Sequence, residues 1–304
     1  MQKSKVNMLD IKSRIGKNKE ISNLFTLKNQ VIVENFFEAK TREDLINIKK
    51  YCLDNNLPLL IIGGGSNIAI LKEKVNGIVV KNSYKELKII EENDDEVIIS
   101  VSSGYPVSLL IAKSLEAGWS GFEYHQGLPG TIGGAIYMNS KWTKPLTYFG
   151  DNLIYGYLLD NQAKIKKVSR DYFQFAYDYS ILQKTKEILL EGIFKLKKED
   201  KKIIKERALF ALNYRKKTQP FGVATCGCFF KNPGNISAGY LIDKAGLKGF
   251  SVGDFYISDI HANFIINKGK GKKEDLLKLL SIIKTKVKEK FGVELEEEVI
   301  IINN

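Results

Sequence analysis

The pattern of apolar and polar residues predicts a chain of mixed helices and strands. Residues 41–44 have the form of a capping box, and apolar side chains then recur at helical spacing, which predicts a helix to about Asn55. Residues 107–117 have the pattern of a second helix. The apolar runs that predict strands are short, and they lie at 57–62, 77–81, 87–90, 97–101, 157–168 and 188–196.

The last third of the chain is also predicted to contain both helices and strands. A helix is predicted over 203–215, and Ser237 is placed to cap another over 238–245 that ends at Gly246. Strands near 255–258 and 262–267 precede a long helix, whose apolar face includes Leu276, Leu280 and Ile283 and which Gly292 closes. The simplest assembly is a β-α-β-β-α-β-like domain. The pattern as a whole indicates an α+β protein.

A run of charged residues at 197–202 is the predicted domain boundary. It divides the chain into residues 1–200 and residues 201–304. A length of 304 residues is enough for about two domains with separate cores. A content of 44% hydrophobic and 27% charged residues is typical of a globular protein.

The formal net charge of +12 changes this picture little. The lysines are spread along the chain without a basic block or recognition motif, so nucleic acid is not the expected partner. Attraction to anionic small molecules is the milder inference, and a lysine-rich genome would explain the same excess. The first residues do not resemble a signal peptide, and no apolar run has the length of a membrane span. With only three cysteines, these features predict a cytoplasmic protein without a membrane or an obligate protein partner.

A glycine-rich segment at residues 127–134 is the most distinctive stretch of the chain. Its four glycines permit backbone angles that other residues avoid, and they let a ligand approach the main chain. Thr131 is placed to cap the element that follows, which would leave the next amides available to an anion. A plain tight turn is the alternative, but it would need only one or two glycines. The predicted cofactor-binding residues here are Pro129, Gly130, Thr131, Gly133 and Gly134.

A second cluster of glycines follows the apolar run that ends at Ile62. A strand that ends in three glycines, a hydroxyl and an amide provides a nest of backbone donors suited to a diphosphate. The pattern matches neither the Walker loop nor the dinucleotide fingerprint. It therefore predicts a phosphate-bearing cofactor outside a Rossmann site. The candidate residues are Gly63, Gly64, Gly65, Ser66 and Asn67.

Seven motifs in a fixed order carry a resemblance to a known family. They lie at 63–67, 127–134, 229–233, 238–242, 245–249, 261–267 and 295–299. Together they resemble the UDP-N-acetylenolpyruvoylglucosamine reductases (UDP-N-acetylmuramate dehydrogenases), and the likeness extends from about residue 41 to residue 302. Each motif is weak alone, whereas seven in order are specific.

The resemblance implies an FAD-binding domain of the PCMH or vanillyl-alcohol-oxidase type, followed by a smaller α/β substrate-binding domain. It also implies noncovalent FAD, NADPH as hydride donor, and a UDP-sugar as substrate. The implied reaction reduces the enolpyruvyl ether of UDP-N-acetylglucosamine enolpyruvate to UDP-N-acetylmuramate, in peptidoglycan precursor synthesis. The chain lacks an obvious tyrosine-bearing insertion before the last domain, which indicates the shorter subtype.

The resemblance also assigns roles to residues of the last third. Cys228 occupies the position of the family's proton-donating serine, and Glu298 that of the glutamate that polarises the enol acid. A buried apolar cysteine is the alternative for Cys228. Cys226 and Cys228 could also suggest a metal, but no second ligand pair is visible, so no metal is predicted. The implied substrate-binding residues are Arg215, Lys217, Lys231, Asn232 and Asn263.

Two departures from the family pattern stand out. Asp178 occupies the position of an arginine that assists the glutamate, so an anion replaces a cation beside an anionic substrate. A smaller departure is the segment at residues 140–144, where the family usually has Ala-Gly-Ala-Tyr after the asparagine. Arg170, Arg215 or a nearby lysine could compensate. The alternatives to a working reductase are a flavoprotein that acts on another small acid, and a flavin-binding paralog that has lost activity.

Overall fold

The computed structural model describes residues 8–72 and 74–303, so the expectation about a signal peptide concerns residues outside the described part. The chain forms two compact units, each assembled from separate stretches. Unit 1 contains residues 1–17, 35–64 and 76–213, and unit 2 contains 18–34, 65–75 and 214–304. The packing units therefore interleave along the chain, whereas the sequence suggested one boundary at residue 200. The assignment of residues 1–200 to FAD and of 201–304 to substrate stays a prediction.

The first part of the fold is one sheet, most of whose residues belong to unit 1, with two helices. In α2, Thr41 Oγ1 accepts a hydrogen bond from the Asp44 amide at 3.0 Å, and Asp44 Oδ2 accepts one from the Thr41 amide at 3.2 Å. The predicted capping box is therefore confirmed, and the apolar face of the helix is buried. The sheet has the order β1-β2-β5-β3, and β3 runs parallel to β5. The elements are α1 (Met8–Arg14), β1 (Gly16–Glu20), β2 (Ile32–Ala39), α2 (Arg42–Asp54), β3 (Leu59–Ile62) and β5 (Lys74–Asn82).

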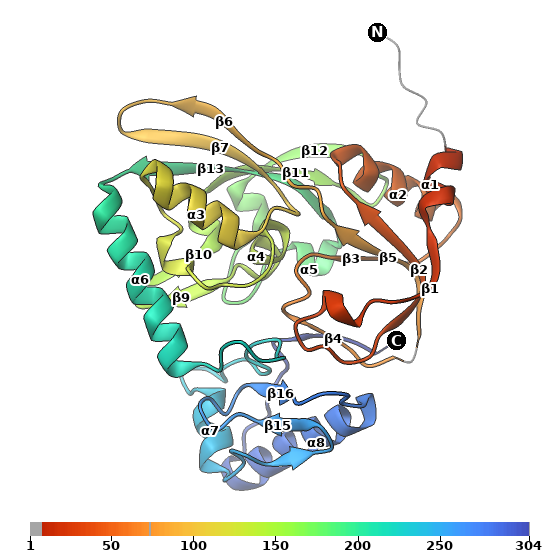
Figure 1. Cartoon of the computed structure of the whole chain (residues 1–304), viewed down its shortest axis with the longest axis vertical. Coiled ribbons are helices and arrows are strands. Elements are labelled where there is room, and N and C mark those ends of the chain that lie inside the picture. The colour runs from red at the N-terminus through yellow and green to blue at the C-terminus, as the bar shows by residue number, and fades with distance from the viewer. Residues whose placement is uncertain (1–7, 73, 304) are drawn as a thin grey trace. The chain divides into compact units, whose positions relative to one another are not determined.

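A larger antiparallel sheet forms the rest of unit 1. Its strands follow the order β12-β11-β13-β7-β6, and β8 pairs with β13. Apolar side chains of α3 and α4 share a buried core with these strands, and Figure 1 shows both helices beside the sheet. The principal elements are β6 (Leu87–Glu92), β7 (Glu96–Ser102), α3 (Val107–Ala117), β8 (Trp119–Ser120), α4 (Ile132–Met138), β11 (Leu153–Leu159), β12 (Ile165–Ser169) and β13 (Ile188–Lys198). The shorter ones are β9 (Lys141–Thr143), β10 (Leu146–Tyr148), α5 (Leu182–Thr185) and 3-10 turns at Glu123–His125, Phe149–Asn152 and Arg170–Phe173.

The prediction of one strand over residues 157–168 is wrong. The chain turns after Leu159, and β11 and β12 form an antiparallel hairpin. Asp160 causes the turn, because its Oδ1 accepts hydrogen bonds from the amides of Gln162 and Lys164, each at 2.8 Å. The polar residues 160–162 mark the turn in the sequence, so the prediction overlooked a local turn signal.

Unit 2 is built on a small antiparallel sheet in the order β14-β15-β16. The long helix α8 packs against β14 and β15, and Figure 1 shows α7 and α8 in blue beside these strands. A separate parallel pair joins β17 to β4. The elements are a 3-10 turn at Ser22–Leu24, β4 (Ile68–Ile70), α7 (Ala238–Lys244), β14 (Ser251–Val252), β15 (Phe255–Ile257), β16 (Ile265–Asn267), α8 (Lys273–Phe291) and β17 (Ile300–Ile302). Helix α6 (Lys201–Thr218) crosses from unit 1 to unit 2 at residue 214.

The helix ends of unit 2 follow the sequence closely. Ser237 Oγ accepts a hydrogen bond from the Tyr240 amide at 3.3 Å, and Gly292 ends α8 with a φ of +69°. The predicted order of strands is wrong, because three antiparallel strands rather than two separate α7 from α8. The extra strand, β14, has only two residues and no apolar run to reveal it.

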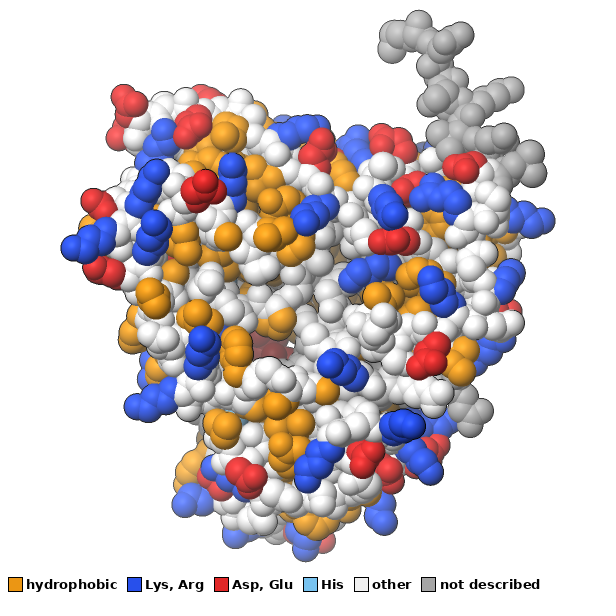
Figure 2. Space-filling model, viewed as in Figure 1, with side chains coloured by type: hydrophobic (Ala, Val, Ile, Leu, Met, Phe, Trp, Pro, Cys, Tyr) orange, Lys and Arg blue, Asp and Glu red, His pale blue; other side chains and the backbone are white. Residues whose placement is uncertain are grey.

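The charged side chains follow the expectation from the sequence. Figure 2 shows lysine and arginine side chains dispersed over the visible face, with aspartate and glutamate among them. No helix of the described chain is long and apolar enough to cross a bilayer. The distribution in this view gives no focused basic surface for a polyanion.

Candidate functional site

The two glycine-rich loops meet in unit 1. A Cβ atom at Gly64 would lie 2.5 Å from the Cα atom of Gly130, well inside van der Waals contact. A Cβ atom at Gly63 would overlap the hydroxyl oxygen of Thr131. Glycine is therefore required at Gly64 for the loops to touch, because the contact there is with main chain. Two segments that the sequence marks separately form one structure.

Main-chain hydrogen bonds fix the central loop on the turn that precedes α3. The amides of Ile132 and Gly133 donate to the carbonyls of Tyr105 and Ser103, at 2.9 and 2.7 Å. Gly130 has a φ of +111°, which strains any residue with a side chain. Thr131 lies at the N-cap of α4, as predicted, but its side chain makes no capping bond. Its hydroxyl oxygen is buried without a hydrogen-bond partner in the described chain.

This junction presents hydrogen-bonding groups that the described protein leaves unused. The amides of Gly63, Gly64 and Gly134 donate to no backbone carbonyl among the described residues. A Cβ atom at Gly134 would meet only Thr131 Oγ1, at 3.9 Å, so space is open there. Unused amides beside an orphaned buried hydroxyl match the phosphate oxygens of a nucleotide cofactor. The residues present thus fit the diphosphate of FAD.

The remainder of the first glycine loop belongs to unit 2. Gly65 has a φ of +63°, and a Cβ atom there would overlap the carbonyl oxygen of Leu24. Asn67 Nδ2 donates to the Glu298 carbonyl at 3.3 Å. These contacts give Gly65 and Asn67 packing roles within unit 2. Cofactor contacts of Gly65, Ser66 and Asn67 stay predictions.

A segment around Cys228 forms the second part of the candidate site. The Phe229 amide donates to the Asn263 carbonyl at 2.8 Å, and the Phe229 carbonyl accepts from the Glu298 amide at 2.8 Å. The segment therefore lies between the chain at 263–264 and the chain at 296–298. Cys228 is half-buried, whereas Cys226 is buried in the core of unit 2. The structure brings together the predicted proton donor and the segment that carries the predicted glutamate.

Arg215 is a buried cation in the same part of unit 2. Only 8% of its surface is exposed, although it lies in the last turn of α6. Burial lowers the pKa of its guanidinium to about 10, and a charge on the Cys228 sulfur opposes this shift. A buried cation is therefore present in the unit that carries the predicted proton donor.

The other predicted substrate-binding residues have varied surroundings. Asn263 is buried, and its side chain accepts from the Phe230 amide at 3.0 Å and donates to the Phe230 carbonyl at 2.8 Å. Asn232 Oδ1 accepts from the Ala238 amide at 3.0 Å. Lys231 Nζ lies 3.6 Å from Glu296, and Lys217 is exposed on α6. These bonds hold the main chain of unit 2, and substrate contacts of the four residues stay predictions.

The two histidines have structural surroundings. His261 Nδ1 accepts from the Asn263 amide at 3.3 Å, and burial lowers the pKa of the imidazole. His125 is fully buried, and its ring lies 5.3 Å from that of Phe149. No group of three His, Cys, Asp or Glu side chains that could hold a metal occurs in the described part of the chain.

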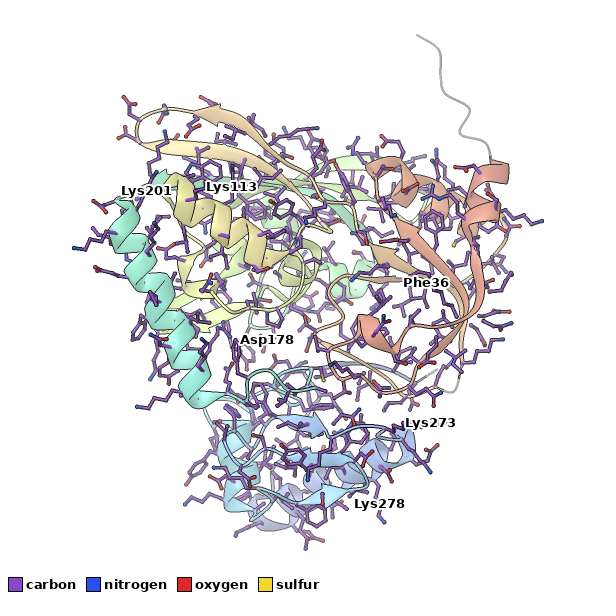
Figure 3. All side chains as sticks on the ribbon, viewed as in Figure 1. Phe36, Lys113, Asp178, Lys201, Lys273 and Lys278 are labelled. Atoms are coloured by element: carbon purple, nitrogen blue, oxygen red, sulfur yellow. The ribbon has the colours of Figure 1, made fainter. Side chains whose placement is uncertain are left out.

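The two departures from the family pattern form one ion pair. Lys141 Nζ lies 3.0 Å from Asp178 Oδ2, and the two side chains are only 18% and 5% exposed. Asp178, labelled in Figure 3, follows Tyr177, whose ring centroid lies 3.3 Å from the same ammonium. Burial alone would lower the pKa of Lys141, but Asp178 and Tyr177 raise it above its ordinary value. Arg170 instead donates to the Gly150 carbonyl, at 3.0 Å. Opposite charges at two unusual positions were the signal in the sequence that could have revealed the pair.

Replacement of Asp178 by asparagine should lower the free energy of unfolding by about 3 kcal/mol, because it leaves the Lys141 ammonium buried without its counter-charge. Urea unfolding measures this loss. The double replacement Asp178→Asn with Lys141→Met should recover most of it, since the buried charge is then gone. Additive losses in the double variant would contradict the pairing.

Comparisons with known proteins match the two regions of the chain that carry the candidate site. Residues 33–169 match the model of an FAD binding domain. Residues 219–302 match the model of the UDP-N-acetylenolpyruvoylglucosamine reductase C-terminal domain. The order of the two matches confirms the predicted fold class. Gly63, Gly64 and the central loop lie in the first match, and Cys228 and Glu298 lie in the second.

Full-length relatives give the same result. The chain is 36% identical to UDP-N-acetylenolpyruvoylglucosamine reductase from Protochlamydia amoebophila over 264 residues, which is 87% of this chain and 86% of the relative. It is 34% identical to the reductase from Bacillus pumilus over 296 residues, which is 96% of each chain. The crystal structure of the reductase from Thermus caldophilus superposes with a TM-score of 0.77 at 28% identity, over 94% of this chain and 98% of that one. The chain therefore belongs to the UDP-N-acetylenolpyruvoylglucosamine reductase family.

Proposed function

We propose that this chain reduces UDP-N-acetylglucosamine enolpyruvate to UDP-N-acetylmuramate, with FAD as cofactor and NADPH as hydride donor. The observation that carries the proposal is the likeness to reductases of this name over 96% of the chain. The reaction belongs to peptidoglycan precursor synthesis. When bound, FAD supplies hydride transfer from NADPH to the substrate.

The cofactor is held by the main chain of unit 1. Gly63, Gly64 and Gly134 offer amides to the diphosphate, and Thr131 offers its hydroxyl. Such donors are fixed by the fold, so they bind an anion without reorganisation. Attachment is noncovalent, because His125, the histidine that precedes the central loop, is fully buried among aromatic side chains.

Unit 2 carries the groups that handle charge and protons. Addition of hydride to the substrate's methylene carbon leaves an electron pair on the carbon that bears the carboxylate. The Cys228 thiol donates its proton to that carbon and becomes a thiolate. Arg215, a buried cation of unit 2, stabilises the thiolate. Glu298 polarises the enol acid, and Lys217, exposed on α6, attracts the substrate diphosphate.

The alternative is a flavin-binding paralog with another substrate or none. This alternative rests on the negative charge of Asp178, but Lys141 neutralises that charge within the protein. An ion-paired carboxylate repels an anionic substrate far less than an isolated one. The working reductase is therefore favoured.

The partner is a small UDP-sugar, and the location is the cytoplasm. No disulfide joins Cys52, Cys226 and Cys228 in the described part of the chain, which supports a reducing compartment. The absence of an insertion before the last domain supports the shorter subtype.

The purified protein should be yellow, and NADPH should bleach its flavin absorbance under anaerobic conditions. The substrate UDP-N-acetylglucosamine enolpyruvate should restore the colour and produce steady NADPH oxidation. Bleaching without substrate-dependent oxidation would support the paralog, and a colourless protein that binds no FAD would overturn the proposal.

A further inference from the structure

Lys81 lies beside the start of the first glycine loop, residues 63–67. It belongs to β5 and pairs with Ile62, the last residue of β3. Its ammonium donates a hydrogen bond to the carbonyl oxygen of Gly63, the first residue of the loop. No sequence motif marks this lysine, because it stands within an ordinary strand.

The charge of Lys81 is not balanced by the described protein. Two other partly buried lysines have close carboxylates, since Lys141 lies 3.0 Å from Asp178 and Lys166 lies 2.5 Å from Glu187. Lys81 has no carboxylate within 4.0 Å among the described residues, and its hydrogen bond there goes to a neutral carbonyl. Burial lowers the pKa of its ammonium, although Glu38 acts in the opposite direction. A buried charge of this kind is costly unless an anion joins it.

The geometry of one peptide unit connects this charge to the unused donors. The bond between Gly63 and Gly64 is trans, so its carbonyl and amide point in opposite directions. With the oxygen held by the Lys81 ammonium, the Gly64 amide points away from β5. That amide has no acceptor in the described backbone. It belongs to the place where the loops meet, since a Cβ atom at Gly64 would approach Gly130 and one at Gly63 would approach the orphaned hydroxyl of Thr131.

We propose that Lys81 is a positioning residue for the diphosphate of the bound flavin nucleotide. It fixes and polarises the Gly63–Gly64 peptide so that the Gly64 amide faces the anion, and it supplies a positive charge behind the loop. A hydrogen bond from an ionised donor is about twice as strong as a neutral one, so the peptide is held firmly. The inference rests on the proposed function, because it takes FAD as the ligand.

The test compares the binding of FAD and riboflavin to the apoprotein by fluorescence titration. Lys81→Met should raise the Kd for FAD about 10- to 100-fold, the range expected for loss of a charge-assisted hydrogen bond. Riboflavin carries no phosphate, so its Kd should change little. Lys81→Arg should restore most of the FAD affinity. Lys85→Met, which removes an exposed lysine of the same segment, is the matched control and should leave both constants unchanged.

Several outcomes would overturn the inference. FAD binding that is unchanged in Lys81→Met, or weakened equally with that of riboflavin, would show that Lys81 has no role toward the phosphates. Lys81→Gln keeps a hydrogen-bond donor for the Gly63 carbonyl but lacks the charge, so its affinity for FAD should lie between those of the wild type and Lys81→Met. It provides the test if Lys81→Met does not fold. A wild-type protein that binds no FAD would instead refute the proposed function.

Discussion

Replacement of Cys228 by alanine should slow reoxidation of the NADPH-reduced enzyme by the enolpyruvyl substrate by about 10²- to 10⁴-fold, the usual contribution of a general acid. The thiol is half-buried, and we propose that the buried Arg215 stabilises the thiolate that proton donation leaves. Bleaching by NADPH should be unchanged, because that half-reaction needs no proton from Cys228. Stopped-flow absorbance of the flavin measures both half-reactions separately.

Two variants control for structural effects of the Cys228 replacement. Cys228→Ser should retain appreciable activity, since serine occupies this position in the family. Cys226→Ala removes a thiol that is only 2% exposed in the core of unit 2, so it should cost about 1 kcal/mol of stability and leave reoxidation unchanged. Equal reoxidation rates in the wild type and Cys228→Ala would show that the proton comes from elsewhere.

Chemical modification gives an independent view of the same thiol. Burial raises the pKa of the Cys226 thiol above its ordinary value and that of Cys52 to about 11, which makes both poor nucleophiles. Cys228 is the most accessible of the three thiols, because the other two are buried. A thiol reagent or peroxide should therefore react at Cys228, and bound substrate should protect it.

Local signals allowed much of the fold to be predicted. Thr41 and Asp44 form the capping box at the start of α2, and Gly292 ends α8. The helix over 107–117 has the predicted bounds. In each case the residues that decide the structure are neighbours in the sequence, so a short window contains the information.

Contacts between distant residues could not be predicted in this way. The interleaving of the two units depends on how strands pair, which the apolar pattern does not specify. The ion pair of Lys141 with Asp178 joins two segments that each look unusual alone. Lys81 is informative only because β5 places it beside Gly63. The motifs point to the segments of the candidate site. The positions of Lys81 and of the Lys141–Asp178 pair are known only from the folded chain.

Replacement of Gly64 by valine should abolish flavin retention. Its Cβ atom would lie 2.5 Å from the Gly130 Cα atom, and the contact is with main chain that cannot rotate away. The two loops would have to separate, and the amides of Gly63 and Gly64 would lose their position. The flavin content of the purified protein, measured from its visible absorbance, should therefore fall to background. Gly130→Val should have the same effect, since Gly130 has a φ of +111°.

A variant at a second glycine distinguishes loss of FAD binding from loss of the fold. A Cβ atom at Gly134 would approach only Thr131 Oγ1, at 3.9 Å, so Gly134→Ala adds a methyl group to the open space without a clash. Alanine in α4 should also stabilise the helix by up to about 1 kcal/mol. Gly134→Ala should thus unfold no earlier than the wild type in urea, yet bind FAD more weakly, because the methyl group occupies the place of a phosphate. A Gly64→Val protein that purifies with full FAD content would refute the proposed diphosphate site at the two glycine loops, and so would a Gly134→Ala protein with unchanged FAD affinity.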